Sequence, residues 1–302
     1  MKEAISTKIL CISFAVFLFV SSETSVKSMA FKLFDAHCHL QDQRVLEKAP
    51  QLIETAVGAG VVYMAVDGIT EKDWHLVQEM SEGYESVIPN FGLHPWFVEG
   101  RSPSWFDTLK QLFEANPSAA VGEIGLDKSS LAKGVDFGQQ VEVFKKQLQL
   151  AKELKRPASV HCLEAFPELL QIMKEMGHFP SGVILHSFNG AAEVVPQLTK
   201  LGSYFSFSGH LIPLQEDEAR KIVKAVPLDR ILLETDSPDA MPTNPIYFVP
   251  GNATLNQPAN VQSILIYVAS LLEMNTEELA EISYNNTVRV FSFRGSKIAS
   301  KP

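Results

Sequence analysis

The chain has 302 residues, of which 46% are hydrophobic and 20% are charged. This balance is ordinary for a folded protein with a large core, and it excludes a disordered or low-complexity chain. The formal net charge of −9 argues against a broad basic groove for nucleic acid, because non-specific binding rests mainly on neutralising phosphates. It leaves room for a metal site that binds a single phosphate or a strand end.

The amino terminus carries an apolar run, residues 9–20, after Lys2 and Lys8. The run is shorter than the roughly 20 residues that cross a bilayer, so we expect no stable membrane span. It fits the hydrophobic part of a targeting segment, or else an upstream extension ahead of Met29. We therefore divide the chain into residues 1–30, a signal or targeting segment or an upstream extension, and residues 31–302, one folded domain.

The three cysteines, Cys11, Cys38 and Cys162, make no disulfide framework. Cys38 and Cys162 lie in strand-like runs and alternate with neighbouring histidines, so we expect both to be small buried residues. Free thiols suit a reducing compartment and favour a cytoplasmic location. A secretory or organellar location would follow if residues 1–28 act as a targeting segment.

Eight strand-like runs alternate with helical patterns along the rest of the chain. Nearly all-apolar strands separated by helices indicate a parallel sheet that is covered on both faces. Eight such units predict a single (β/α)8 TIM barrel with its active site at the C-terminal ends of the strands. No Gly-x-Gly-x-x-Gly follows the first run, which argues against an open doubly wound sheet. The runs are residues 33–40, 61–68, 87–94, 119–127, 157–163, 182–189, 203–209 and 231–236.

Helical patterns occupy the gaps, and one long irregular stretch follows the eighth run. Residues 239–258, rich in proline, would lie at the active-site mouth as a lid or substrate loop. Asn275 with Glu278 three residues on predicts a helix start of the capping-box type, and residues 288–293 should pack back on the barrel. The helical patterns are residues 51–57, 137–154, 166–176, 191–201 and 216–226.

Candidate metal ligands lie at the ends of five of the eight runs. His37 and His39 are two apart, so on a strand their side chains point to the same side. Six of the eight histidines (37, 39, 94, 161, 186 and 210) lie at or just beyond the end of a run. The carboxyl ends of barrel strands meet at one mouth, which predicts one site. The candidate ligands are His37, His39, Glu123, His161, His186 and Asp236.

These nitrogen and carboxylate ligands, without thiolates, suit Zn, Mn, Fe, Ni or Mg. Six ligands are too many for one four-coordinate catalytic ion that keeps an open position. They fit two divalent ions about 3.5–4 Å apart, with Glu123 bridging them.

In this order and spacing, six motifs resemble the TatD-type metal-dependent deoxyribonucleases of the amidohydrolase superfamily, in particular their fungal and plant branch. The resemblance extends from about residue 33 to residue 293. The motifs are Asp35-Ala-His-Cys-His-Leu, Gly92-Leu-His-Pro95, Gly122-Glu-Ile-Gly-Leu-Asp127, Val160-His161, His186-Ser-Phe-Asn-Gly190 and Glu234-Thr-Asp-Ser-Pro238.

The resemblance implies a TIM-barrel hydrolase with two metal sites. His37, His39, Glu123 and Asp236 would hold one divalent ion, and Glu123, His161 and His186 would hold the other. His94 resembles the family's substrate-facing histidine. The family's activity is hydrolysis of DNA phosphodiesters, often as an exonuclease, with a cation such as Mg; Mn and Zn are alternatives here.

We therefore interpret the protein as a two-metal hydrolase whose substrate is single-stranded DNA or the ends of DNA strands. Asp236 is our candidate general base, His94 the contact to the phosphate or leaving group, and Asn189 a substrate-binding residue. The alternatives are a barrel amidohydrolase acting on an ester, lactone or amide, and a non-catalytic scaffold on the same fold. The sequence does not specify the oligomeric state.

Residues around these candidates have interpretations of their own. We expect His210 to be a loop histidine, because it matches none of the family's ligands, and Asp127 to fix the loop after the fourth strand. Glu234 would support the site or pair with a group inside the barrel. Trp96 and Phe97 would stack on a base or pack at the mouth, and Arg101 would meet a phosphate. Two departures from the family pattern, Leu163 and Asn256-Gln257-Pro258, would lie among the substrate contacts.

Overall fold

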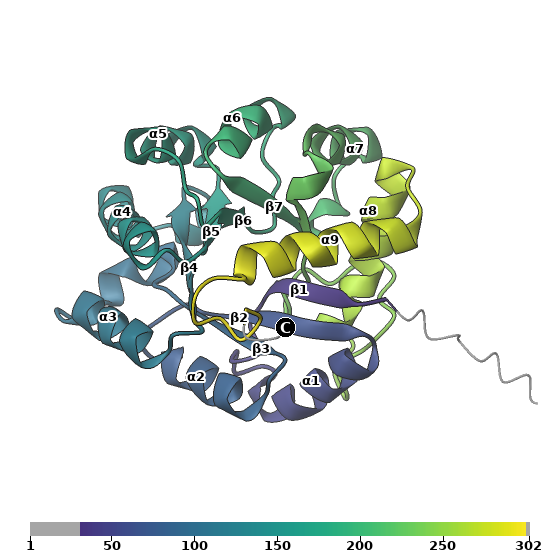
Figure 1. Ribbon diagram of the computed structural model, residues 1–302, viewed down its shortest axis with the longest axis horizontal. Helices are drawn as coiled ribbons and strands as arrows, with labels where there is room; N and C mark the ends of the chain where they lie inside the picture. The colour runs from purple at the N-terminus through teal and green to yellow at the C-terminus, as the bar shows by residue number, and fades with distance from the viewer. Residues whose placement is uncertain (1–30, 300–302) are drawn as a thin grey trace, which may run out of the picture.

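The computed structural model describes residues 31–299 and consists of a single eight-stranded parallel sheet surrounded by helices (Figure 1). The strands pair in sequence order, β1 to β8, and every pair is parallel. The strands are β1 (Leu33–Cys38), β2 (Val61–Gly68), β3 (Val87–Phe91), β4 (Ala120–Asp127), β5 (Ala158–Leu163), β6 (Val183–Leu185), β7 (Ser203–Phe207) and β8 (Ile231–Leu233).

The sheet closes between β8 and β1 just beyond the last residues of β8. The amide of Asp236 donates to the carbonyl of His37 (3.0 Å), and the amide of His39 donates to the carbonyl of Ser237 (2.7 Å). Below them, Thr235 donates from its amide (2.8 Å) and its hydroxyl (2.6 Å) to the carboxylate of Asp35. The predicted (β/α)8 barrel is confirmed, and three of the candidate ligands, His37, His39 and Asp236, lie at its seam.

All eight predicted strands are present, and several end earlier than their apolar runs. β6 ends at Leu185 and β8 at Leu233, and a residue with a left-handed backbone conformation follows shortly after each, Ser187 (φ 44°) and Asp236 (φ 54°). The predicted run 203–209 ends at Phe207 because a 3-10 turn, Gly209–Leu211, follows it. The polar ends of the runs therefore belong to loops at the mouth of the barrel.

The helices agree with the predicted patterns except at residues 191–201. That segment divides into a 3-10 turn, Ala192–Val194, and α6, whose first turn contains Pro196. Proline lacks the amide hydrogen that would continue an earlier helix, so it favours a new start. The helices are α1 (Ala49–Gly58), α2 (Trp74–Gly83), α3 (Trp105–Ala115), α4 (Phe137–Leu154), α5 (Phe166–Met176), α6 (Val195–Lys200), α7 (Glu216–Ala225), α8 (Val261–Leu272) and α9 (Thr276–Phe291).

Helix α9 crosses the end of the barrel, as Figure 1 shows. Its apolar side chains join the hydrophobic cluster at this end. Asn275 caps this helix by accepting a bond from the amide of Glu277 (2.7 Å), one residue before the position that the capping box predicts. Phe291 stacks on Phe34 inside the barrel, with ring centroids 5.2 Å apart. The predicted packing of residues 288–293 on the barrel is confirmed, and the amino-terminal end of the barrel has an apolar filling.

The segment 239–258 contains no helix or extended strand until Pro258, where the 3-10 helix Pro258–Asn260 begins. Its two ends are tied together because the amide of Asn256 donates to the carbonyl of Pro238 (2.9 Å). Within residues 31–299 no helix combines the length and the hydrophobicity needed to cross a membrane. The apolar run 9–20 and the division at residue 30 lie outside the described residues, so both stay predictions.

Candidate metal centre

The six predicted ligands converge on Glu123, which projects from β4 into the mouth of the barrel. Its carboxylate is 2% exposed, and its two oxygens face two different groups of side chains. His37 and His39 come from the end of β1, His161 from β5, and His186 and Asp236 from the residues after β6 and β8. The polar residues at the strand ends therefore form one cluster.

On one side of Glu123, Oε2 lies with the side chains of His37, His39 and Asp236. The Nε2 atoms of the two histidines are 3.1 Å apart, and they lie 3.6 and 3.4 Å from Oε2. They lie 3.7 and 3.6 Å from Oδ1 of Asp236. Ligand atoms about 2.0–2.2 Å from one tetrahedral ion are separated by roughly 3.3–3.6 Å. These four side chains therefore have the spacing of one coordination sphere.

On the other side, Oε1 of Glu123 lies among three histidines. Nε2 of His186 is 2.8 Å away, and both Nδ1 of His161 and Nε2 of His94 are 3.3 Å away. Nδ1 of His161 is also 3.3 Å from Nε2 of His186. A carboxylate whose two oxygens face separate donor groups has the arrangement of a bridging ligand.

Each of the four candidate histidine ligands has an oxygen atom near its second ring nitrogen, and in three of them the two atoms are hydrogen-bonded. Protein histidines that bind metal through one nitrogen usually donate from the other to a carboxylate, carbonyl or hydroxyl, which selects the tautomer. Nδ1 of His39 lies 2.8 Å from the carbonyl of Asp67, and Nε2 of His161 lies 3.1 Å from Asp127. Nδ1 of His37 lies 3.0 Å from Ser159 Oγ, and Nδ1 of His186 lies 3.5 Å from Glu234. All four rings thus turn one nitrogen toward the centre.

The centre contains several buried carboxylates, and neither lysine nor arginine pairs with them in the described chain. Six carboxylates are at most 8% exposed, and the ion pairs of these groups within the described chain involve histidines alone. Burying so much negative charge is costly unless cations neutralise it. The donor set therefore fits divalent cations. The six are Asp35, Asp67, Glu123, Asp127, Glu234 and Asp236.

The acidity of these groups reflects the same concentration of charge. Burial would raise the pKa of Glu123, but the charges of His94 and His186 and the hydrogen bonds of His161 and His186 hold it well below its ordinary range. Burial would lower the pKa of His39, but the hydrogen bond to Asp236 and the charges of Glu123 and Asp236 raise it to about 10. The neighbouring carboxylates likewise raise the pKa of His161 and His186 against the effect of burial, so without metal they favour protons at positions where a cation would replace them.

His94 differs from the other histidines of the centre. Its burial lowers its pKa to about 4, so the ring is neutral at physiological pH. Nδ1 accepts a bond from the amide of Trp96 (3.2 Å), which leaves the ring proton on Nε2. Nε2 faces Oε1 of Glu123 at 3.3 Å. His94 thus presents an N–H donor to the centre.

Two glutamines of α4 hold the backbone that carries the site, and the sequence reasoning missed both. Gln147 accepts from the amide of Leu93 (2.8 Å) and donates to its carbonyl (3.0 Å). Gln140 makes the same pair of bonds with Asp127, at 2.8 and 3.0 Å. Both glutamines are at most 1% exposed. Their spacing of seven residues, on the buried face of a predicted helix, was the available signal.

Asp67 on β2 was also missed, although its polar side chain near the end of an apolar run was a signal. Its Oδ2 lies 3.3 Å from Nδ1 of His37, and its Oδ1 accepts from Asn90 (2.9 Å). Burial raises the pKa of Asp67 to about 6. Together with its carbonyl contact to His39, Asp67 orients both histidines of β1.

Glu234 and Asp127 fix loops and also touch ligand histidines. Oε1 of Glu234 accepts from the amide (2.6 Å) and the hydroxyl (2.9 Å) of Ser187, and it lies near His186. Asp127 accepts from the amide of Ser129 (2.7 Å) with one oxygen, and from the indole of Trp96 (2.6 Å) with the other. The second oxygen of Asp127 also faces His161.

His210 lies in a loop, as expected, and it also contacts a candidate ligand. It lies on the 3-10 turn after β7, and its Nε2 is 3.3 Å from Oδ2 of Asp236. Arg101 was expected to meet a phosphate, but its guanidinium donates to the carbonyl of Val98 and to Gln139. Arg101 thus ties the loop after β3 to α4.

The remaining candidates lie at the rim or beneath it. Asn189 is exposed three residues after His186, and Trp96 and Phe97 are 37% and 38% exposed. Asn256 and Gln257 are at most 1% exposed, so they lie beneath the mouth surface rather than among substrate contacts. Asn256 donates to the carbonyls of Thr235 (3.0 Å) and Ala240 (3.2 Å), which holds the loop after β8. Cys38 and Cys162 are buried free thiols, as predicted.

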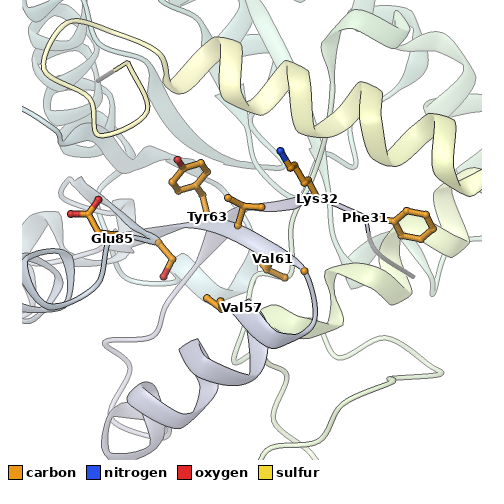
Figure 2. Close-up of a pocket in the computed structure, with 9 residues that line it drawn as sticks. Phe31, Lys32, Val57, Val61, Tyr63 and Glu85 are labelled. Carbon is orange, nitrogen blue, oxygen red and sulfur yellow. The ribbon is translucent and has the colours of Figure 1, made fainter. Parts of the chain in front are cut away.

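A pocket of about 450 Å³ lies away from this centre, at the opposite end of the strands. Figure 2 shows its lining around Phe31, Lys32, Val61 and Tyr63, with Glu85 at its edge. These residues belong to the starts of β1 and β2 and to the segment before β3. Because barrel chemistry occurs at the carboxyl ends of the strands, we place no catalytic role in this pocket.

Known proteins share this fold and sequence pattern. The family model for TatD-related DNases matches residues 34–292. The uncharacterized metal-dependent hydrolase YabD of Bacillus subtilis is 32% identical over 259 residues, which cover 86% of this chain and 98% of the relative. Human deoxyribonuclease TATDN3 is 30% identical over 272 residues, covering 86% and 94%. The crystal structure of YjjV, a TatD homologue from Escherichia coli, superposes with a TM-score of 0.77 at 26% identity, covering 88% of this chain and 100% of that one.

Proposed function

The chain belongs to the TatD-related DNase family and is a metal-dependent hydrolase, and from this premise we propose that it cleaves DNA phosphodiester bonds with two divalent cations held on either side of Glu123. The observation that supports the proposal most strongly is the common orientation of the four histidine rings around Glu123. Each directs one nitrogen toward Glu123, and in His37, His39 and His161 the other nitrogen bonds to an outer oxygen. Histidines in a merely structural polar cluster have no need of this common orientation.

The residues divide into two groups of ligands. His37, His39 and Asp236 with Oε2 of Glu123 would hold one cation, and His161 and His186 with Oε1 would hold the second. Bound there, the cations would acidify a water and neutralise the charge that develops on a phosphoryl group. Nitrogen and carboxylate donors suit Mn or Zn, and Mg in the site where oxygen donors are richer.

Asp236 is the proposed general base. Opposing the effect of its burial, hydrogen bonds from His210 and His39 hold the pKa of Asp236 well below its ordinary range, so it remains a carboxylate at neutral pH. In that form it accepts the proton of the water that attacks phosphorus. Its 8% exposure leaves a path from the mouth to its oxygens.

His94 is the proposed contact to the phosphate or the leaving oxygen. The neutral ring holds its proton on Nε2, which faces the centre, so it can donate a hydrogen bond where negative charge accumulates. Donation from a neutral ring avoids placing another positive charge beside the histidine ligands.

The mouth offers contacts for a single strand or a strand end. Trp96 and Phe97 expose aromatic surface on which a base can stack, and Asn189 lies at the rim beyond His186. A pocket of about 520 Å³ along the loop after β4 is lined by Asp127, Lys128 and Lys133 among others, and would receive a flanking phosphate. The net charge of −9 favours such local contacts over a long duplex groove, and it supports an exonuclease.

Metal analysis combined with end-labelled DNA tests the proposal. The full chain should contain up to two divalent ions, and with Mg or Mn it should shorten single-stranded DNA from one labelled end, with EDTA abolishing the reaction. Glu153→Ala, at an exposed position of α4, is the matched surface control for Glu123→Ala. A second outcome is that the protein binds metal, cleaves no nucleic acid and turns over an ester, lactone or amide. This outcome would overturn the proposed nuclease function in favour of an amidohydrolase. Failure to bind metal at all would favour the scaffold.

A further inference from the structure

His210 contacts the carboxylate of Asp236 from a turn that the family resemblance does not include among the ligands. Nε2 of His210 lies 3.3 Å from Oδ2 of Asp236, and the side chain is 52% exposed. We propose that His210 is a positioning residue: it donates to Oδ2 and thereby directs Oδ1 of Asp236 toward His37 and His39. The inference rests on the proposed metal role of Asp236 and names a residue that sets the geometry of that site.

The two oxygens of Asp236 face different neighbours. Oδ1 lies 3.7 and 3.6 Å from the Nε2 atoms of His37 and His39, on the side where a cation would bind. Oδ2 faces His210 at 3.3 Å and the hydroxyl of Ser187 at 3.5 Å. A carboxylate at the end of a short strand can rotate unless its outer oxygen has a partner, so the contacts to Oδ2 determine where Oδ1 points.

His210 is the stronger of the two partners of Oδ2. The hydroxyl of Ser187 is already engaged, because it donates to Oε1 of Glu234 at 2.9 Å and pairs with the hydroxyl of Ser208 at 2.7 Å. A hydroxyl has one hydrogen to donate, so its contact with Oδ2 at 3.5 Å is secondary. The outer oxygen of Asp236 therefore depends mainly on the imidazole of His210.

The turn that carries His210 is held in place by its surroundings. The hydroxyl of Ser208 accepts from the amide of His210 (3.3 Å), which caps the turn. Gly209 lies against the loop after β8, and a Cβ atom added there would lie 1.9 Å from the carbonyl oxygen of Ala240. The two loops can therefore pack this closely only because residue 209 is glycine. His210 is thus attached to the segment that follows Asp236.

The geometry also separates His210 from the candidate ligands. The groups of side chains with metal-like spacing in the described chain include His37, His39, His94, His161 and His186, but not His210. Within residues 31–299, the ion-pair contact of its half-exposed ring is with the outer oxygen of a proposed ligand, Asp236. His210 is thus placed as a residue that bonds to a metal ligand without binding the metal itself. The loss of such a residue typically lowers metal affinity or activity by about 10–100-fold.

Two variants of similar size test the donor. His210→Leu removes the N–H, whereas His210→Gln keeps a side chain that can donate to Oδ2. His178→Leu, at an exposed loop histidine, is the matched control. Affinity for Mn²⁺ is measured on the full chain by competition with a chromophoric chelator, without substrate. We expect about tenfold weaker binding of one of the two ions in His210→Leu, recovery to within about threefold in His210→Gln, and no change in His178→Leu.

Wild-type Mn²⁺ affinity in His210→Leu would overturn the inference, and so would a loss in His210→Gln as large as that in His210→Leu. Unfolding curves of the metal-free variants show whether either substitution acts through the fold, and His210→Ala replaces the leucine variant if that does not fold. Since no DNA is present, absence of nuclease activity would overturn the proposed substrate and leave this result intact. A protein that binds no Mn²⁺ in any form would overturn both.

Discussion

The two sides of Glu123 differ in charge and in completeness. The Oε2 side combines two histidines with a second carboxylate, Asp236, and its donor atoms lie 3.1–3.7 Å apart. The Oε1 side has only the shared carboxylate and the imidazoles of His161 and His186, with His94 beside them. We therefore expect the Oε2 side to bind a cation more tightly, and the Oε1 side to leave more of its coordination sphere for substrate.

The largest effect should come from removing the residue that the two sides share. Glu123→Ala should lose both ions and lower kcat/KM by about 10³-fold or more, because metal catalysis contributes several kcal/mol and each 1.36 kcal/mol is about tenfold. Metal content by mass spectrometry and cleavage of labelled DNA measure the two losses. Full metal loading with normal activity would refute the bridging assignment, and Glu153→Ala should match the wild type.

Removing one ligand from each side should separate the two sites. Asp236→Asn should deplete the Oε2 side and His161→Ala the Oε1 side, each leaving about one ion per chain and lowering turnover about 10²-fold or more. Titration with Mn²⁺ and a chelator gives the number and affinity of the sites. Because the Oε2 side has the extra carboxylate, the ion that remains in His161→Ala should be the tighter one. The reverse order would contradict the comparison.

His94 should affect turnover without affecting the ions. His94→Leu should reduce kcat by about 10²-fold, as expected for the loss of one donor to developing charge, while metal content stays at the wild-type level. His94→Gln keeps a donor and should recover part of the rate. Loss of an ion in His94→Leu would instead make this residue a ligand of the Oε1 side.

The most gradual predicted effect is the pH dependence of metal binding. In the metal-free protein the pKa of His39 is raised to about 10, so at neutral pH a cation on the Oε2 side must displace a proton. Affinity should therefore rise by up to about tenfold per pH unit toward pH 10, with proton release. Calorimetry in buffers of different ionisation enthalpy measures that release. The pKa of His94 is lowered to about 4, so above pH 5 this residue has no proton to contribute to the release. Metal binding at neutral pH without proton release would contradict the assignment of His39 as a ligand.

The sequence by itself determined the barrel and the cluster of candidate ligands. Alternating apolar runs and helical patterns predict eight strands, and a barrel brings the residues at the ends of those strands to one mouth whatever the loops do. The positions of His37, Glu123, His161, His186 and Asp236 could therefore be predicted from where each run ends. The ends of the strands are predictable because apolar runs and helical periodicity depend on residues that are close together in the sequence.

Only the tertiary structure decided how each side chain is oriented. The outer partner of His37 is Ser159, 122 residues away, and that of His210 is Asp236 across the junction of two loops. The glutamines of α4 hold strand ends that lie 13 and 54 residues from them. No local pattern encodes such pairs, since they depend on which loops the closed barrel brings together and on the space that Gly209 leaves beside Ala240.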